Sequence, residues 1–242
     1  MREDHFGPEI AETYDESSAE MFDPAKVEPA AELLSELAGG GRALEFAIGT
    51  GRIALPLAAR GTEVCGLDLS EAMVEQLRRK PGGRELAVTI GDMASTRVEG
   101  SFRLVYLVFN TILNLTTQDD QVACFANAAA HLEPGGRFVI EVGIPELRRL
   151  PPGERYVVFH GEADRWGIDE YDTAPQSLVS HHIRDEGAGL RHMAIPFRYV
   201  WPAELDLMAR LAGMTLESRW CDWHRQPFDH ESTAQVSVWR KG

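Results

Sequence analysis

Five short apolar runs alternate with helix-like segments between Arg42 and Val142. The runs are continuously apolar, as in LVYLVF, which is typical of strands covered on both faces of a sheet. This βαβα order predicts a parallel sheet with helices on both faces. We predict strands at 42–47, 63–67, 86–90, 102–109 and 136–142, and helices at 51–60, 71–80 and 118–132.

Segments of different character flank this region. Residues 9–22 are charged and predict a helix ahead of the main fold. A second helix is expected to start at Pro24 with Asp23 as its N-cap, and to end at the Gly39-Gly40-Gly41 run. At the other end, a helix over 202–212 closed by Gly213 and strands at 214–220 and 235–240 are predicted.

The spacing of apolar residues changes between Pro145 and Phe197, where no segment has the spacing of a helix. The stretches RYVVFH, DEYDT, SLVSHHIR and RHMAIPFRYV indicate antiparallel strands inserted after the fifth strand. The expected division is a helical segment (1–40), a ligand-binding core (41–144), an antiparallel β cap (145–200), and a helix with two strands that complete the core sheet (201–242).

Charge narrows the range of partners. With 24 basic and 38 acidic residues, the net charge of -14 opposes binding to nucleic acid or an anionic membrane and favours a small-molecule partner. No apolar run approaches the ~20 residues of a membrane span, and no N-terminal signal core is present. Three scattered cysteines, Cys65, Cys124 and Cys221, are typical of a cytoplasmic protein without disulfides.

Two motifs at strand ends indicate a nucleotide-type ligand. Gly49-Thr50-Gly51 follows the first strand, where glycines permit a sharp turn and close approach of a ligand. Asp68 follows the second strand, where a carboxylate accepts hydrogen bonds from ribose hydroxyls. Taken alone, the pair fits a nicotinamide cofactor as well as an adenosyl one, since Gly49 to Ala54 reads G-x-G-x-x-A.

A third motif, Gly91-Asp92-Met93, follows the third strand. The Asp92 carboxylate could accept a hydrogen bond from an adenine amino group while Met93 lies on the adenine ring. Three such strand ends in a row would face one crevice.

Together these motifs resemble the class I S-adenosylmethionine-dependent methyltransferases, over roughly residues 44–141. The resemblance rests on the first-strand acid Glu45 before G-T-G, on Asp68 in GLDLSEAM, on Asp92 in GDM, and on the L-E-P-G-G run at 132–136. It implies a Rossmann-like sheet of seven mostly parallel strands. Many relatives have Gly-Cys or Gly-Ser where this chain has Ala47-Ile48.

The resemblance also implies the ligand and its site. The cofactor would be S-adenosylmethionine, with its methyl group transferred by in-line displacement, mainly through positioning of the reactants. The expected cofactor-binding residues are Glu45, Phe46, Ala47, Gly49, Thr50, Gly51, Arg52, Asp68, Leu69, Met73, Asp92, Met93, Phe109 and Asn110.

Catalytic candidates are His181 on an inserted strand, Asn110 after the fourth strand, and Tyr14 in the leading segment. A base would help if the acceptor is an alcohol, phenol or ammonium. Weaker candidates for the acceptor pocket are His182, Asn114, Arg198, Tyr199 and Trp201. No H-x-H or H-E-x-x-H spacing points to a metal.

The sequence leaves several interpretations of function open. The acceptor atom could be oxygen, nitrogen or carbon. The chain could instead be a non-catalytic protein that binds S-adenosylmethionine, or a nicotinamide-dependent oxidoreductase. Free edges of the inserted strands suggest a homodimer.

Overall fold

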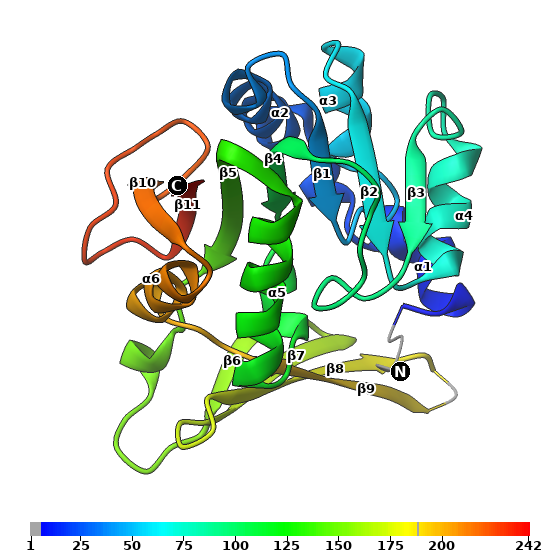
Figure 1. Ribbon diagram of the computed structural model, residues 1–242. Helices are drawn as coiled ribbons and strands as arrows, with labels where there is room; N and C mark the ends of the chain where they lie inside the picture. Colours follow the sequence, from blue (N-terminus) through cyan, green and yellow to red (C-terminus); the bar gives the residue numbers. More distant parts are fainter. Residues whose placement is uncertain (1–5, 188) are drawn as a thin grey trace.

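The computed structural model describes residues 6–187 and 189–242. Its centre is a seven-stranded sheet in the order β10-β11-β5-β4-β1-β2-β3 (Figure 1). All strands run parallel except β11, which is antiparallel to both of its neighbours. The strands are β1 (Ala43–Phe46), β2 (Val64–Asp68), β3 (Ala87–Ile90), β4 (Phe102–Leu107), β5 (Leu132–Gly143), β10 (Met214–Trp220) and β11 (Ala234–Lys241).

Helices cover both faces of this sheet, and each face has its own apolar core. One core packs α2 (Pro24–Ala38), α3 (Ala54–Ala59) and α4 (Glu71–Arg79) against the strands. The other packs α5 (Gln118–His131) and α6 (Pro202–Leu211). The predicted fold class, a mostly parallel α/β sheet with an antiparallel cap, is confirmed.

Helix ends follow the local sequence. The Asp23 carboxylate accepts from the Ala25 amide at 2.9 Å, and Gly39 ends α2 in the left-handed region with φ +55°. Ser70 and Thr117 cap α4 and α5 in the same way. One predicted boundary is wrong: the helix expected from Gly51 begins at Ala54, because Gly51 has a φ of +81°, which a right-handed helix excludes.

Other boundaries also differ from the prediction, and the strand expected at 102–109 ends at Leu107. The leading segment divides into α1 (Pro8–Ser17) and a 3₁₀ turn, η1 (Ala19–Phe22). The fifth strand begins at Leu132 rather than Gly136, since Phe102 of β4 pairs with Leu132 across a register shift.

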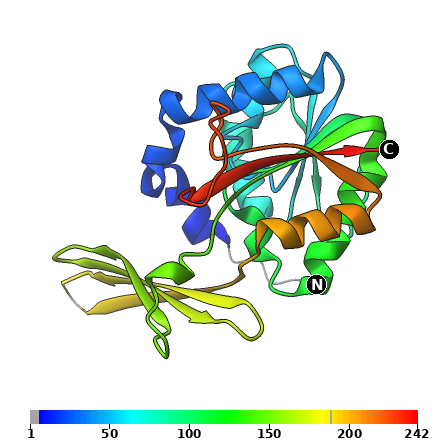
Figure 2. The same ribbon diagram turned by 90° about the vertical axis from the view of Figure 1, so that its left-hand side faces the viewer.

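The insertion forms a separate antiparallel sheet in the order β6-β7-β8-β9, preceded by the 3₁₀ turn η3 (Leu147–Arg149). Its strands are β6 (Tyr156–Gly161), β7 (Arg165–Asp172), β8 (Ser177–Asp185) and β9 (Leu190–Arg198). The sheet projects from the core below the carboxyl ends of the parallel strands (Figures 1 and 2). The division of the chain into domains stays a prediction.

A buried polar network joins this cap to the core. Arg198, 5% exposed, pairs with Glu204 of α6 at 2.7 Å and donates to the fully buried Gln121 of α5. The Gln121 amide donates in turn to the carbonyls of Arg198 and Ile112. Burial raises the pKa of Glu204, but hydrogen bonds from Arg198, Gln176 and Gln118 outweigh it and lower that pKa overall.

No helix among residues 6–187 and 189–242 is long and apolar enough to cross a membrane.

Candidate active site

A cavity of about 380 Å³ lies at the carboxyl ends of β1, β2 and β4 and beside the loop after β3. In open parallel sheets this edge is where ligands bind. Helix α1 and strand β9 contribute the remaining walls. The lining residues are Phe6, Tyr14, Glu45, Ala47, Ile48, Gly49, Thr50, Arg52, Ile53, Leu67, Asp68, Leu69, Ser70, Met73, Gly91, Asp92, Met93, Val108, Phe109, Thr111, Asn114, Leu115, Thr116 and Pro196.

The loop after β1 turns through left-handed conformations. Ala47 and Gly49 both have a φ of +54°. This conformation costs a non-glycine residue about 1 kcal/mol or more, so Ala47 is a strained residue on the cavity wall. A Cβ on Gly49 would contact only the end of Met73, at 3.4 Å, which leaves the loop backbone open to a ligand. Ile48 fills the space above Gly66.

Asp68 links two loops that line the cavity. Its carboxylate accepts from the Gly49 amide at 2.6 Å and from the Ser70 amide at 2.8 Å. The side chain is buried in the protein interior yet lines the cavity. A ligand at this point meets a carboxylate already oriented by two backbone donors.

Asp92 and Met93 form the wall beside β3. The Asp92 carboxylate accepts from the Ala94 amide at 2.8 Å, and its own amide donates to the Thr96 hydroxyl at 2.9 Å. Asn127 of α5 donates to the Met93 carbonyl at 2.8 Å. These contacts fix the turn and leave both side chains on the cavity wall.

Helix α1 is tied to the glycine loop. The Thr50 hydroxyl donates to Asp15 at 2.6 Å, and Lys80, which follows α4, pairs with the same carboxylate. Tyr14 lines the cavity beside Phe6, with their rings 6.1 Å apart edge to face. Burial raises the pKa of the Tyr14 phenol, so this side chain is a neutral hydrogen-bonding group at physiological pH.

Glu45 is a buried acid beneath the glycine loop. It is 2% exposed and accepts from the Tyr106 hydroxyl at 2.9 Å. Burial raises its pKa from 4.5 to about 8. Nearby, Arg52 donates to the Met21 carbonyl and lies over the Phe109 ring. Its buried Nη2 has no hydrogen-bond partner among the described residues, which suits it to an anionic ligand group.

Replacing Glu45 with glutamine should remove a pH dependence of stability. A carboxyl whose folded-state pKa is raised adds stability below its unfolded pKa and loses it as pH rises through the folded value. The wild type should therefore lose stability between pH 4.5 and about 8. At pH 8, Glu45→Gln should be more stable than the wild type by at least about 1 kcal/mol.

Urea unfolding of ligand-free protein at pH 5 and pH 8 measures this difference. Glu63→Gln is the matched control, because Glu63 is exposed and pairs with Arg42 at the opposite end of the sheet. An equal pH dependence of the free energy of unfolding in the wild type and Glu45→Gln would contradict the raised pKa of Glu45.

The wall opposite the glycine loop comes from the segment after β4 and from β9. Thr111, Asn114 and Thr116 carry the polar groups, and Pro196 of β9 also lines the cavity. The 3₁₀ turn η2 (Thr111–Asn114) is held by Gln121 of α5, whose amide also holds β9. One buried amide therefore sets the spacing of both parts of this wall.

The structure brings most of the predicted residues together. Those that line the cavity are Tyr14, Glu45, Ala47, Gly49, Thr50, Arg52, Asp68, Leu69, Met73, Asp92, Met93 and Phe109. Their binding roles stay predictions.

Four predicted residues lie elsewhere. Phe46 packs against Phe138 in the core under α5. A Cβ on Gly51 would strike Leu77 at 2.4 Å, so this glycine serves packing. Asn110 has a φ of +61° and accepts from the Gly143 amide at 2.6 Å, which directs its side chain to β5. His181 stacks on His192 within the cap.

Of the weaker candidates for the acceptor pocket, one lines the cavity and the others lie elsewhere. Asn114 lines the cavity. His182 lies against Phe159 in the cap, Tyr199 packs on Tyr171 in the small cap core, and Trp201 is exposed before α6. Arg198 belongs to the network that anchors the cap.

Several lining residues carried no signal in the sequence. Phe6, Thr111, Thr116 and Pro196 come from separate segments and belong to no motif. Only the fold brings together the segment before α1, the segment after β4 and strand β9, which carry these residues.

Comparisons with known proteins agree with this arrangement. Residues 43–136 match a family described as methyltransferase domain. The solved structure of the CcbJ methyltransferase from Streptomyces caelestis is 36% identical, with all of both chains covered and a TM-score of 0.88.

Two curated proteins are similar over part of the chain. A dTDP-3-amino-3,4,6-trideoxy-alpha-D-glucopyranose N,N-dimethyltransferase of Streptomyces venezuelae is 34% identical over 62% of this chain and 65% of its own length. A dTDP-4-amino-2,3,4,6-tetradeoxy-D-glucose N,N-dimethyltransferase of Saccharopolyspora spinosa is 36% identical over 40% of this chain and 39% of its own. The alignments therefore span less than two thirds of these relatives.

Proposed function

Because the chain belongs to the S-adenosylmethionine-dependent methyltransferases, we propose that it methylates an amine nitrogen of a small molecule of the amino-sugar type. The observation that carries the proposal is the cavity at the strand ends. One of its walls has the residues expected to bind a nucleotide-like donor, and the other, from the segment after β4 and from β9, has no charged side chain among the described lining residues. The names of the two sugar N,N-dimethyltransferases support nitrogen as the acceptor atom.

The residues on the first wall fit the donor. Gly49 leaves the loop backbone open, and Asp68 presents a carboxylate suited to ribose hydroxyls. The unpaired Nη2 of Arg52 suits the carboxylate of the methionine portion. When bound, S-adenosylmethionine supplies an electrophilic methyl group on a positively charged sulfonium.

The opposite wall favours an amine over a hydroxyl. No histidine lines the cavity among the described residues, and burial keeps the Tyr14 phenol protonated. A neutral amine attacks through its own lone pair and sheds its proton to water after transfer, so it needs no base. The protein contributes by holding the amine in line and excluding water, which is worth up to roughly 7–11 kcal/mol in model reactions.

Replacing His181 with alanine should leave methyl transfer nearly unchanged. Its ring contacts His192 at 3.0 Å and Glu170 at 3.4 Å, within the cap sheet. We expect kcat to change less than about threefold, whereas removing a general base costs about 100- to 10,000-fold. A loss in that range, measured by steady-state kinetics, would restore His181 as a catalytic candidate.

The proposed function is tested by transfer of labelled methyl from S-adenosylmethionine to a matched acceptor pair. One acceptor is an amino-sugar methyl glycoside, and the other carries a hydroxyl in place of the amine. We expect label only in the amine, with a rate that rises as the ammonium group is titrated. Label in the hydroxyl compound alone would contradict the proposal.

The cap supports a second proposal, a homodimer formed through the inserted strands. Tyr156 and Val158 on the edge strand β6 are each 57% exposed, and Leu190 on β9 is 67% exposed. Edge strands with exposed apolar side chains are stabilised by pairing with another chain. Light scattering should give twice the 26.9 kDa chain mass, and a monomer would rule the dimer out.

We also propose a cytoplasmic location and no nucleic-acid partner. The three cysteines form no disulfide with one another, which suits a reducing compartment. The net charge of -14 disfavours a phosphate backbone.

A further inference from the structure

We propose that Asn114 holds the acceptor amine, with its side-chain oxygen accepting a hydrogen bond from an N–H of the attacking nitrogen. The inference rests on the proposed function and names the residue that recognises its acceptor. Asn114 is the last residue of η2 and lines the cavity on the wall opposite the glycine loop. A donor bound at that loop leaves this wall to the acceptor.

The side-chain amide of Asn114 is not used by the fold. The residue is half-buried, and its amide makes no hydrogen bond with any residue among 6–187 and 189–242. A side-chain amide offers one acceptor oxygen and two N–H donors. Left unpaired at a cavity wall, these groups are available to a ligand.

Other polar side chains of this segment are committed or lie further out. The Thr111 hydroxyl donates to the Val108 carbonyl at 2.7 Å. The Asn110 side chain accepts from the Gly143 amide at 2.6 Å. Thr116 is exposed. Asn114 is therefore the residue of this wall that combines partial burial with an unused hydrogen-bonding group.

The backbone around Asn114 is fixed from several sides. The Leu115 amide donates to the Ile112 carbonyl at 3.2 Å, and the fully buried Gln121 donates to the same carbonyl at 3.2 Å. The side chains of Ile112 and Leu115 are themselves fully buried in the core under α5. A ligand therefore meets an amide on a rigid turn, which lowers the entropic cost of orienting the acceptor.

The chemistry of the transfer explains why an amide oxygen serves here. An amine attacks with its lone pair, so its N–H bonds must point away from the methyl group. A hydrogen bond from one N–H to the Asn114 oxygen fixes that orientation. The nitrogen–carbon bond forms as the sulfur–carbon bond breaks, and the bonding electrons stay on sulfur. The nitrogen then gives one proton to water, and Asn114 keeps its own protons throughout.

The first test replaces the amide with an apolar group of similar size. With the amino-sugar methyl glycoside as acceptor, Asn114→Leu should lower kcat/KM about tenfold, the scale of one hydrogen bond. Its dissociation constant for S-adenosylhomocysteine should stay within about twofold of the wild type, because the donor residues lie on the other wall. An unchanged kcat/KM, or an equal loss of donor affinity, would overturn the inference.

Gln118→Leu is the matched control. Gln118 carries the same amide group, is exposed, and lies four residues further along the chain at the start of α5. Its side chain donates to Glu204 at 2.8 Å and does not line the cavity. We expect kcat/KM to stay within about twofold of the wild type. An equal loss in the two variants would show that the amide of Asn114 has no special role.

The second test keeps the acceptor oxygen and adds a charge. Asn114→Asp has the same shape, and its carboxylate should raise the pKa of the bound amine. Since only the neutral amine attacks, the rise of kcat with pH should move up by about one unit or more. Asn114→Leu should show no upward shift. If Asn114→Leu does not fold, Asn114→Asp carries the test alone.

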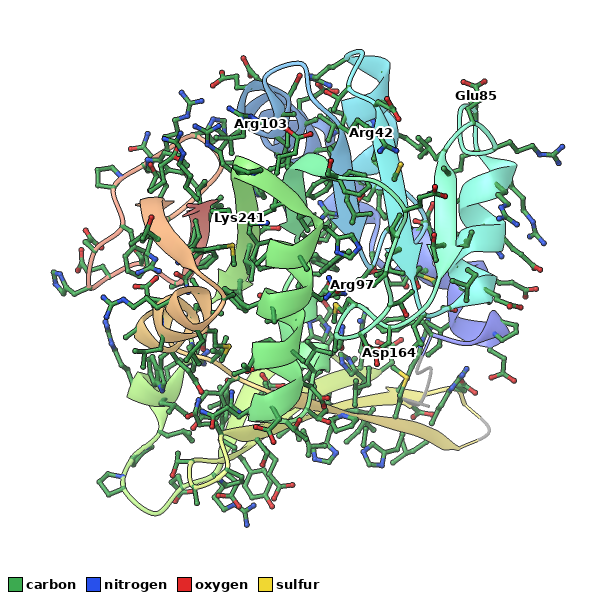
Figure 3. All side chains as sticks on the ribbon, in the orientation of Figure 1. Arg42, Glu85, Arg97, Arg103, Asp164 and Lys241 are labelled. Atoms are coloured by element: carbon green, nitrogen blue, oxygen red, sulfur yellow. The ribbon has the colours of Figure 1, made fainter. Side chains whose placement is uncertain are left out.

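Other charges near the amine are the same in every variant, so a shift in the pH profile isolates position 114. Arg42, Arg103 and Lys241 lie in the upper half of Figure 3, away from the cap, and act on the amine only weakly. The titratable side chains that line the cavity are Tyr14, Glu45, Arg52, Asp68 and Asp92.

The elements packed against η2 add charges that are already paired. Glu141 of β5 accepts from the Trp223 indole at 2.8 Å. Arg198 of β9 pairs with Glu204 at 2.7 Å. These contacts do not involve Asn114, so its substitution leaves them in place.

A binding measurement separates failure of this inference from failure of the proposed function. The amino-sugar methyl glycoside is titrated by calorimetry into protein saturated with S-adenosylhomocysteine. At pH 7, Asn114→Asp should bind the ammonium form about tenfold more tightly than the wild type, whether or not transfer occurs. Tighter binding without label in the amine contradicts the proposed function alone. Unchanged affinity in Asn114→Asp overturns the inference, with or without transfer in the wild type.

Discussion

Asp68→Ala should weaken binding of S-adenosylmethionine by about 1–3 kcal/mol, or roughly 5- to 150-fold, the scale of hydrogen bonds to a charged group. The carboxylate lines the cavity and is held by the Gly49 and Ser70 amides at 2.6 and 2.8 Å. The variant loses a ligand contact and also the tie between the two loops that surround the ligand. Calorimetric titration measures the loss directly.

The matched control for Asp68→Ala is Glu63→Ala. Glu63 precedes the same strand β2 at its amino end and is exposed, paired only with Arg42. Its removal should leave donor affinity unchanged. Circular dichroism of both variants verifies that they fold. An unchanged dissociation constant in folded Asp68→Ala would contradict the ribose assignment.

Gly51→Val should destabilise the whole protein by about 3–5 kcal/mol, combining overpacking with a β-branched residue in a left-handed conformation. A Cβ at this position would lie 2.4 Å from Leu77 Cδ1 and 3.2 Å from Leu55 Cγ, inside the core under α3 and α4. The backbone has a φ of +81°. Urea unfolding measures the loss.

Gly61→Val separates the two causes of this loss, the backbone strain and the collision with Leu77. Gly61 has a φ of +89°, but a Cβ there would meet no atom within 4 Å. It therefore carries the backbone strain without the collision and should cost about 1–3 kcal/mol. Equal losses in the two variants would show that packing against Leu77 plays no part.

Gly51 also illustrates how far the sequence could predict the site. The motif pointed to the correct loop, since Gly49 and Gly51 both adopt positive φ. The motif could not show which glycine faces the ligand and which faces the core. That depends on Leu77 of α4, which lies 26 residues further along the chain and packs behind the loop. Gly49 faces the cavity and Gly51 the core.

The fold was predictable because its signals are local. Apolar runs, the caps Asp23 and Ser70, and the final glycine of α2 all act within a few residues, and each helix or strand forms near its expected place. The sheet of seven mostly parallel strands followed from the resemblance and is confirmed. Exceptions such as the late start of α3 arise where a residue adopts positive φ.

The acceptor wall was the least predictable part. Asn110 occupies a motif position, yet its side chain is used by the Gly143 amide of β5. Pro196 and Thr116 belong to no motif and line the same cavity, and Gln121, from a third element, binds the segments just before and after them at Ile112 and Arg198. Long-range contacts of this kind leave no local pattern in a single sequence.

The most direct test of the cofactor assignment is calorimetric titration of the wild-type protein with S-adenosylmethionine and S-adenosylhomocysteine, with reduced nicotinamide cofactors as controls. We expect micromolar binding of both adenosyl ligands and none of the nicotinamides. Binding of a nicotinamide cofactor in preference to the adenosyl ligands would contradict it.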